Sequence, residues 1–211
     1  MEKNTTSAEE LKTIRTIMEE STRFLSLSGL AGVFMGLAAI LGAVLVHIIV
    51  LENGSLRLDA YFSYLAISEV NRIPWGIISI ALAVLLFSAA VAFYFSHRNA
   101  AKSGRSIMTP VAKRLLINLL IPLVTGGIFS FILMFQDLYQ LIVPVLLIFY
   151  GLGLVNAGKF TYSEVFYLGL CEIFTGLVST FFPALGLIFW SIGFGLMHIG
   201  YGIYMFRKYE S

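Results

Sequence analysis

Six long apolar runs divide the sequence and leave few polar residues between them. They lie near residues 24–51, 74–96, 115–135, 138–158, 160–181 and 183–206. Each run holds about 20 or more residues, the length that a helix needs to cross a hydrocarbon layer roughly 30 Å thick. Charged residues make up only 12% of the chain, about half of their share in a soluble domain. The sequence therefore predicts an all-α, polytopic six-helix transmembrane bundle in residues 24–211, with no soluble domain.

The basic residues of the chain lie mostly on one side of these six runs. Twelve fall on the side of the two termini: Lys3, Lys12, Arg15, Arg23, Arg98, Lys102, Arg105, Lys113, Arg114, Lys159, Arg207 and Lys208. The opposite side holds two, Arg57 and Arg72. Because Lys and Arg are retained in the cytoplasm, this asymmetry predicts that both termini are cytoplasmic. An even number of spans agrees with that orientation.

Residues 1–23 precede the first run and are rich in charge. Ser7 begins a capping box that Glu10 completes, and apolar residues follow at helical spacing, so we expect an amphipathic cytoplasmic helix over residues 7–23. Such a helix either lies on the bilayer surface or binds a membrane or cytoplasmic protein partner. The first apolar run begins too late for a removable signal peptide, and we expect it to be retained.

Glycine is abundant in the apolar runs and recurs on single faces of the predicted helices. Small residues at positions 28, 32 and 36 form one such face of the first run, and glycines form others in the fourth and sixth. Small residues allow helix backbones to approach closely inside a membrane. We expect helix packing at Gly29, Gly32, Gly36, Gly151, Gly153, Gly193 and Gly195.

The stretch from Ser21 to Gly36, STRFLSLSGLAGVFMG, resembles the opening of an uncharacterised group of bacterial multi-spanning inner-membrane proteins. The resemblance covers about one span. It implies a bacterial inner (plasma) membrane as the location, and it supplies no activity.

Two ionisable side chains lie inside the last two runs. Glu172 follows Glu164 by eight residues, and His198 precedes Arg207 by nine. At 1.5 Å per residue, both lie roughly 12 to 14 Å from the same membrane face. An ionisable residue inside a spanning helix is costly and suggests a functional site whose partner should be named. Their matching depth predicts that Glu172 and His198 are partners, provided that the two helices turn these faces toward each other.

Two interpretations of this pair are open. In the first, Glu172 is a protonated carboxyl hydrogen-bonded to Thr175, Tyr201 or a backbone carbonyl, and its role is structural. In the second, Glu172 and His198 exchange protons and line a polar passage, as acidic and histidine side chains do in membrane relays. Asn118 and Asn156 lie nearer the cytoplasmic face and would extend that passage inward.

The remaining motifs argue against catalysis. The three histidines fall in different runs and form no H-E-x-x-H pattern, and a single cysteine forms no thiolate cage, so we expect neither a metal nor a cofactor. No Gly-x-Ser-x-Gly turn offers an intramembrane nucleophile. The basic loops are explained by topology and contact with the lipid bilayer, without nucleic acid. The sequence favours a non-enzymatic membrane module (a subunit, scaffold or regulator), with a small proton-linked transporter or channel as the alternative.

Overall fold

The computed structural model describes Glu9 and residues 23–50, 75–104, 106–182 and 185–211. The described part is helical and contains no strand. It includes five helices that are long and apolar enough to cross a membrane: Gly29–Ile48, Trp75–Lys102, Pro110–Phe135, Tyr139–Phe160 and Gly186–Tyr209. This content is compatible with a multi-pass membrane protein. The predicted amphipathic helix over residues 7–23 falls almost wholly outside the described residues.

The helices of the described part are α2 (Gly29–Val50), α4 (Trp75–Lys102), α5 (Pro110–Phe135), α6 (Ile142–Ala157), α7 (Ser163–Ser179), α8 (Gly186–Trp190) and α9 (His198–Tyr209). Short 3-10 turns, η1 (Tyr139–Leu141) and η2 (Gly158–Phe160), extend α6 at both ends. A π-helical segment, η4 (Ser191–Met197), joins α8 to α9, so that the three form one continuous helix.

Two helix boundaries differ from the predicted runs for physical reasons. The helix α5 begins at Pro110 because the Thr109 side chain accepts a hydrogen bond from the Ala112 N–H and proline fits the first helical turn. The helix α7 has only 17 residues, about 25 Å of helix, whereas the run 160–181 had predicted more. It is therefore the one predicted span that is absent from the five long apolar helices of the described part.

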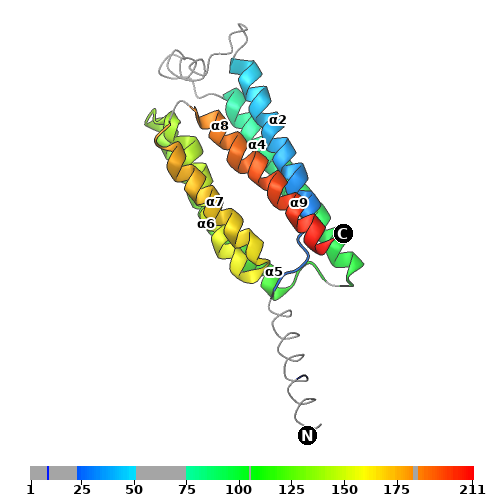
Figure 1. Ribbon diagram of the computed structural model, residues 1–211. Helices are drawn as coiled ribbons and strands as arrows, with labels where there is room; N and C mark the ends of the chain where they lie inside the picture. The colour runs from blue at the N-terminus through cyan, green and yellow to red at the C-terminus, as the bar shows by residue number, and fades with distance from the viewer. Residues whose placement is uncertain (1–8, 10–22, 51–74, 105, 183–184) are drawn as a thin grey trace.

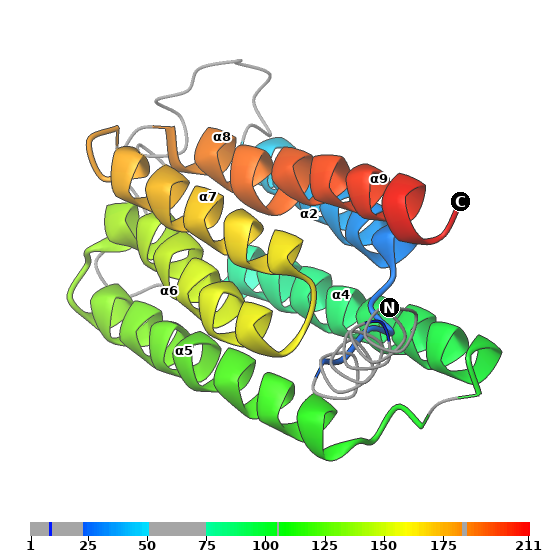
Figure 2. The same cartoon turned by 60° about the horizontal axis from the view of Figure 1, so that its bottom comes forward.

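The helices form two groups that run side by side (Figures 1 and 2). In one group α6 packs between α5 and α7, and in the other α2 packs between α4 and the α8–η4–α9 helix. The groups meet where η4 contacts α2 on one side and α7 on the other. The last helix therefore belongs to one group and forms the boundary with the other.

Glycines set the closeness of several helix pairs. On α2, a Cβ built at Gly36 would lie 2.5 Å from the Gly195 carbonyl oxygen, and one at Gly29 would lie still closer to the Gly202 carbonyl oxygen of α9. The approach is less close at Gly32, where the nearest α9 backbone atom would be 3.0 Å away. On α6, a Cβ at Gly151 would lie 2.6 Å from the Gly169 carbonyl oxygen of α7. Further glycines face side chains of neighbouring helices: Gly153 faces Leu119 and Leu123, Gly193 faces Leu147 and Glu172, and Gly195 faces Ile40. At these positions a larger residue would push helices apart.

A non-helical segment, residues 23–28, leads into α2, where the sequence had predicted a span from residue 24. Its backbone is bound to the α6–α7 connection: the Phe24 N–H donates to the Phe160 carbonyl at 2.7 Å, and the Thr161 hydroxyl donates to the Phe24 carbonyl at 2.6 Å. At its end, the Gly29 N–H donates to the Glu210 carboxylate at 2.5 Å. A carboxylate is favourable at a helix N-terminus. This segment thus ties the two helix groups and the C-terminus together.

Candidate functional site

The side chains of Glu172 and His198 meet at the boundary between the two helix groups. Glu172 comes from α7 and His198 is the first residue of α9, and the carboxyl Oε1 lies 3.4 Å from the imidazole Nδ1. Both residues are buried, with 0% and 3% of their surface exposed. The depth argument from the sequence placed these side chains together, and the structure brings them into contact.

The imidazole of His198 is held on both ring nitrogens. Its Nδ1 lies 3.1 Å from the Gly193 carbonyl oxygen, and its Nε2 lies 2.7 Å from the Tyr150 hydroxyl oxygen. Because a carbonyl oxygen only accepts, Nδ1 carries the proton, and Nε2 then accepts from the Tyr150 hydroxyl. These two bonds fix the tautomer and the ring orientation of a neutral His198.

Glu172 differs from His198 because its carboxyl oxygens have no hydrogen-bond partner among the described residues. Thr175 was an expected partner, but its hydroxyl donates to the Cys171 carbonyl oxygen at 2.8 Å. The carboxyl fits against Gly193, where a Cβ would lie 2.6 Å from Oε2. Natural proteins satisfy nearly all buried polar atoms, so an unpartnered carboxyl requires an explanation.

The backbone around the pair is also unusual. The seven residues of η4 form a π-helix directly before His198, inside an otherwise α-helical segment. Such wide turns are rare and are frequent at functional sites, where they change the direction in which later side chains point. Here η4 places the carbonyl of Gly193 beside the imidazole of His198.

Tyr150 completes this buried cluster, although sequence reasoning missed it. The signal was present, because Tyr150 precedes Lys159 by nine residues, the same offset that separates His198 from Arg207. The depth argument therefore applied to Tyr150 as well, but a tyrosine in an apolar run was given no role. We call Glu172, His198 and Tyr150 the buried triad.

Asn118 and Asn156 do not extend the triad. The Asn118 side chain donates to the Arg114 carbonyl oxygen of its own helix at 2.8 Å, and the Asn156 side chain accepts from Lys159 at 3.3 Å. Their hydrogen bonds are thus satisfied locally, near the ends of α5 and α6. Among the described residues, neither asparagine is hydrogen-bonded to the triad.

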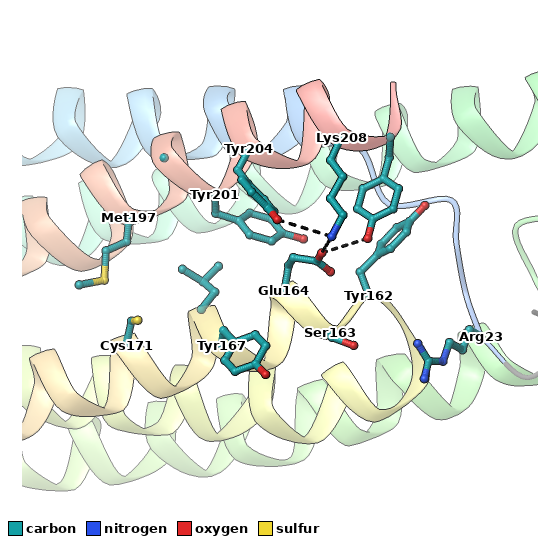
Figure 3. Close-up of a pocket in the computed structure, with 13 residues that line it drawn as sticks. Arg23, Tyr162, Ser163, Glu164, Tyr167, Cys171, Met197, Tyr201, Tyr204 and Lys208 are labelled. Atoms are coloured by element: carbon teal, nitrogen blue, oxygen red, sulfur yellow. Dashed lines mark hydrogen bonds and ion pairs between the residues drawn. The ribbon is translucent and has the colours of Figure 1, made fainter. Parts of the chain in front are cut away.

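A groove lies between α7 and α9 (Figure 3), and its inner end is lined by Cys171 and Met197, which adjoin Glu172 and His198 in the sequence. Its volume is about 690 Å³. The α7 side contributes Tyr162, Ser163, Glu164, Tyr167, Leu168 and Cys171; the α9 helix and the preceding residue Met197 contribute Gly200, Tyr201, Tyr204, Lys208 and Tyr209; Arg23 lies at the open end. Lys208 bridges the two helices through Glu164, with the ammonium 2.6 Å from the carboxylate.

Comparison of the chain with protein-family models, curated proteins and solved structures found no match. The assignment of a function therefore rests on the helical architecture, the buried triad and the groove.

Proposed function

We propose that this protein is a small proton-linked transporter or channel, with Glu172 and His198 as its proton-exchanging site. The observation that carries the proposal is the Glu172 carboxyl, which is buried and unpartnered among the described residues, and which faces an imidazole. A purely structural carboxyl would be expected to hold a hydrogen bond. A carboxyl that gains and loses a proton during a functional cycle instead needs a nearby group whose charge responds, and His198 is that group.

The location of the triad supports the same proposal. Glu172 belongs to one helix group and His198 to the other, so a change of charge on either alters the attraction between the groups. Conformational change follows when a ligand, here a proton, binds two arrangements with different affinity. The groove between α7 and α9 leaves space at this boundary for such a movement.

The proposal includes the six-span topology, with α7 as the fifth of the six crossings and both termini in the cytoplasm of a bacterium. Its support is the twelve-to-two distribution of basic residues and the length of α7, which lies at the lower limit for a spanning helix. Reporter fusions after residues 105, 159 and 211 should report a cytoplasmic location, and a fusion after residue 60 an external one. A cytoplasmic residue 60 would contradict the topology.

The test of proton exchange uses Cys171, the single cysteine of the chain, which is exposed and adjoins Glu172. An environment-sensitive fluorophore on Cys171, in protein reconstituted into nanodiscs, should change its emission as pH is varied from about 5 to 9. Glu172→Gln should abolish this change, because the amide does not titrate. Glu164→Gln, on the same helix but outside the triad, is the matched control and should retain it. Superimposable titrations of the wild type and Glu172→Gln would rule out the proposal.

The second candidate is a non-enzymatic membrane module. It is favoured by the burial of Glu172 and His198, whose surfaces are 0% and 3% exposed. Its partner would bind through residues 7–23. Deletion of residues 1–20 should then abolish partner association. The emission of the labelled protein should be independent of pH in the full chain and in the deletion variant alike.

A further inference from the structure

We propose that the groove between α7 and α9 binds an anionic phospholipid, with one acyl chain along the groove and the phosphate at Arg23. This inference uses the membrane placement proposed above but does not depend on proton exchange at the triad. It assigns a ligand to a surface that the triad does not use.

The dimensions of the groove match one leaflet of a bilayer. On α7 its lining extends from Ser163 to Cys171, and on the opposite helix from Met197 to Tyr209. At 1.5 Å per residue these stretches are about 12 and 18 Å long. Half of a hydrocarbon layer roughly 30 Å thick is about 15 Å. An acyl chain that enters at the basic end would therefore end beside Cys171 and Met197, one residue from each member of the Glu172–His198 contact.

The chemistry of the lining changes along the same direction. The inner part is built by Leu168, Cys171, Met197 and Gly200, which offer an apolar surface. The outer part carries Arg23, Lys208 and Glu164, together with tyrosine hydroxyls (Figure 3). A lipid has the same order of properties, with an apolar chain followed by a charged headgroup.

Charge selects the headgroup. Two cationic side chains and one carboxylate line the groove, and the carboxylate is already bound by Lys208. Among the described lining residues, the guanidinium of Arg23 is thus the cation in excess, and its planar array of donors suits phosphate oxygens. An anionic headgroup is therefore preferred over a zwitterionic one.

Gly200 keeps the inner groove open. A Cβ built on Gly200 would meet no atom within 4 Å, in contrast to the glycines of α2. Gly127 on α5 is equally unobstructed but lies outside the groove. Leucine at position 200 should therefore fill the groove without disturbing the helix packing, and leucine at position 127 provides a matched control.

The test is a native mass spectrometry titration of the detergent-solubilised full chain with phosphatidylglycerol. The wild type should retain one lipid. Gly200→Leu should weaken retention at least tenfold, Gly127→Leu should leave it unchanged, and Arg23→Gln should weaken it about fivefold, the effect of one basic side chain on attraction to an anionic lipid surface. Circular dichroism and monodispersity verify that each variant is folded.

Several outcomes would overturn the proposal. Equal retention by Gly200→Leu and Gly127→Leu would place the lipid elsewhere, and equal retention of phosphatidylcholine would remove the assigned role of Arg23. A concentration-dependent dimer that Gly200→Leu abolishes would make a second copy the occupant. The alkylation rate of Cys171 distinguishes a further occupant. If this rate rises when residues 1–20 are deleted and stays unchanged when lipid is removed, the occupant is the N-terminal segment of the chain.

Discussion

The two sides of the last helix are built on opposite principles. On the side of α2, glycines bring the backbones so close that a Cβ at Gly36 would lie 2.5 Å from the Gly195 carbonyl oxygen. On the side of α7, its neighbour along the chain, the helices touch through side chains, among them Glu172 with His198 and Glu164 with Lys208, and leave a groove of about 690 Å³ between them. A short connection thus guarantees that two helices are neighbours, but side chains decide how closely they pack.

The difference separates a structural contact from one that is free to change. Backbone-to-backbone packing has a single close arrangement, because any shift loses van der Waals contact along its length. The α7 side is held by side chains instead: the Glu172–His198 and Glu164–Lys208 pairs, and the packing of Met197 and Tyr201 against the cluster that includes Leu168. Such contacts lose less than backbone packing when the helices move. The α2 side therefore holds the last helix in place, and the α7 side is where we expect movement.

The largest expected effect comes from placing leucine on the tight side. Gly36→Leu would drive a side chain into the η4 backbone, and overpacking of this kind typically costs about 1–3 kcal/mol, or more where the backbone cannot shift. We expect loss of most folded, monodisperse protein after detergent extraction. Gly200→Leu places a leucine in the groove between α7 and α9. The extraction yield and the unfolding midpoint of this variant should equal those of the wild type. Equal loss in both variants would mean that the two sides do not differ.

A smaller loss is expected when the imidazole is removed. His198→Leu leaves the Tyr150 hydroxyl and the Gly193 carbonyl without their partner, which should destabilise the protein by about 1–3 kcal/mol. Thermal unfolding in detergent measures the change. In the double variant with Tyr150→Phe, part of that loss should be recovered, because the orphaned hydroxyl is gone. Strictly additive losses would show that the hydrogen bond to Tyr150 contributes nothing.

Removing the carboxyl should cost almost nothing in stability. Glu172 holds no hydrogen bond among the described residues, so Glu172→Leu breaks none and relieves the burial of a polar group. We expect an unfolding midpoint equal to or above that of the wild type, together with loss of the pH response of labelled Cys171. A loss of more than about 1.5 kcal/mol would show that the carboxyl is a structural element.

Much of the architecture could be predicted from hydropathy and spacing. The helical class and the five long apolar helices follow from runs whose length matches a bilayer. The contact between Glu172 and His198 was expected from their equal depth in the bundle. That depth was counted along each helix from a charged residue at the same end, Glu164 for Glu172 and Arg207 for His198. These features depend on local composition or on a simple count along a helix, which is why one sequence was sufficient.

Other features depend on contacts between residues far apart in the sequence, and residue spacing does not predict them. The Gly29 N–H is capped by Glu210, 181 residues away, and residues 23–28 are held out of helix by the α6–α7 connection. The π-helix before His198 has no sequence signature. Its glycines, Gly193 and Gly195, are explained equally well by close helix packing. The groove arises from the divergence of α7 and α9, which no local pattern records.

The smallest expected effect concerns the ion pair that bridges the groove at its outer end. The Lys208 side chain is 46% exposed, so its attraction to Glu164 is screened and should contribute little to stability. Glu164→Gln should therefore leave the unfolding midpoint unchanged. It should nevertheless raise the rate at which a bulky maleimide alkylates Cys171, because the bridge joins the two helices that line the groove between its outer end and Cys171 (Figure 3). Salt should raise the wild-type rate toward that of the variant, since screening weakens the same pair. An alkylation rate unaffected by both changes would mean that the groove is entered from its side, and that the ion pair has no part in access.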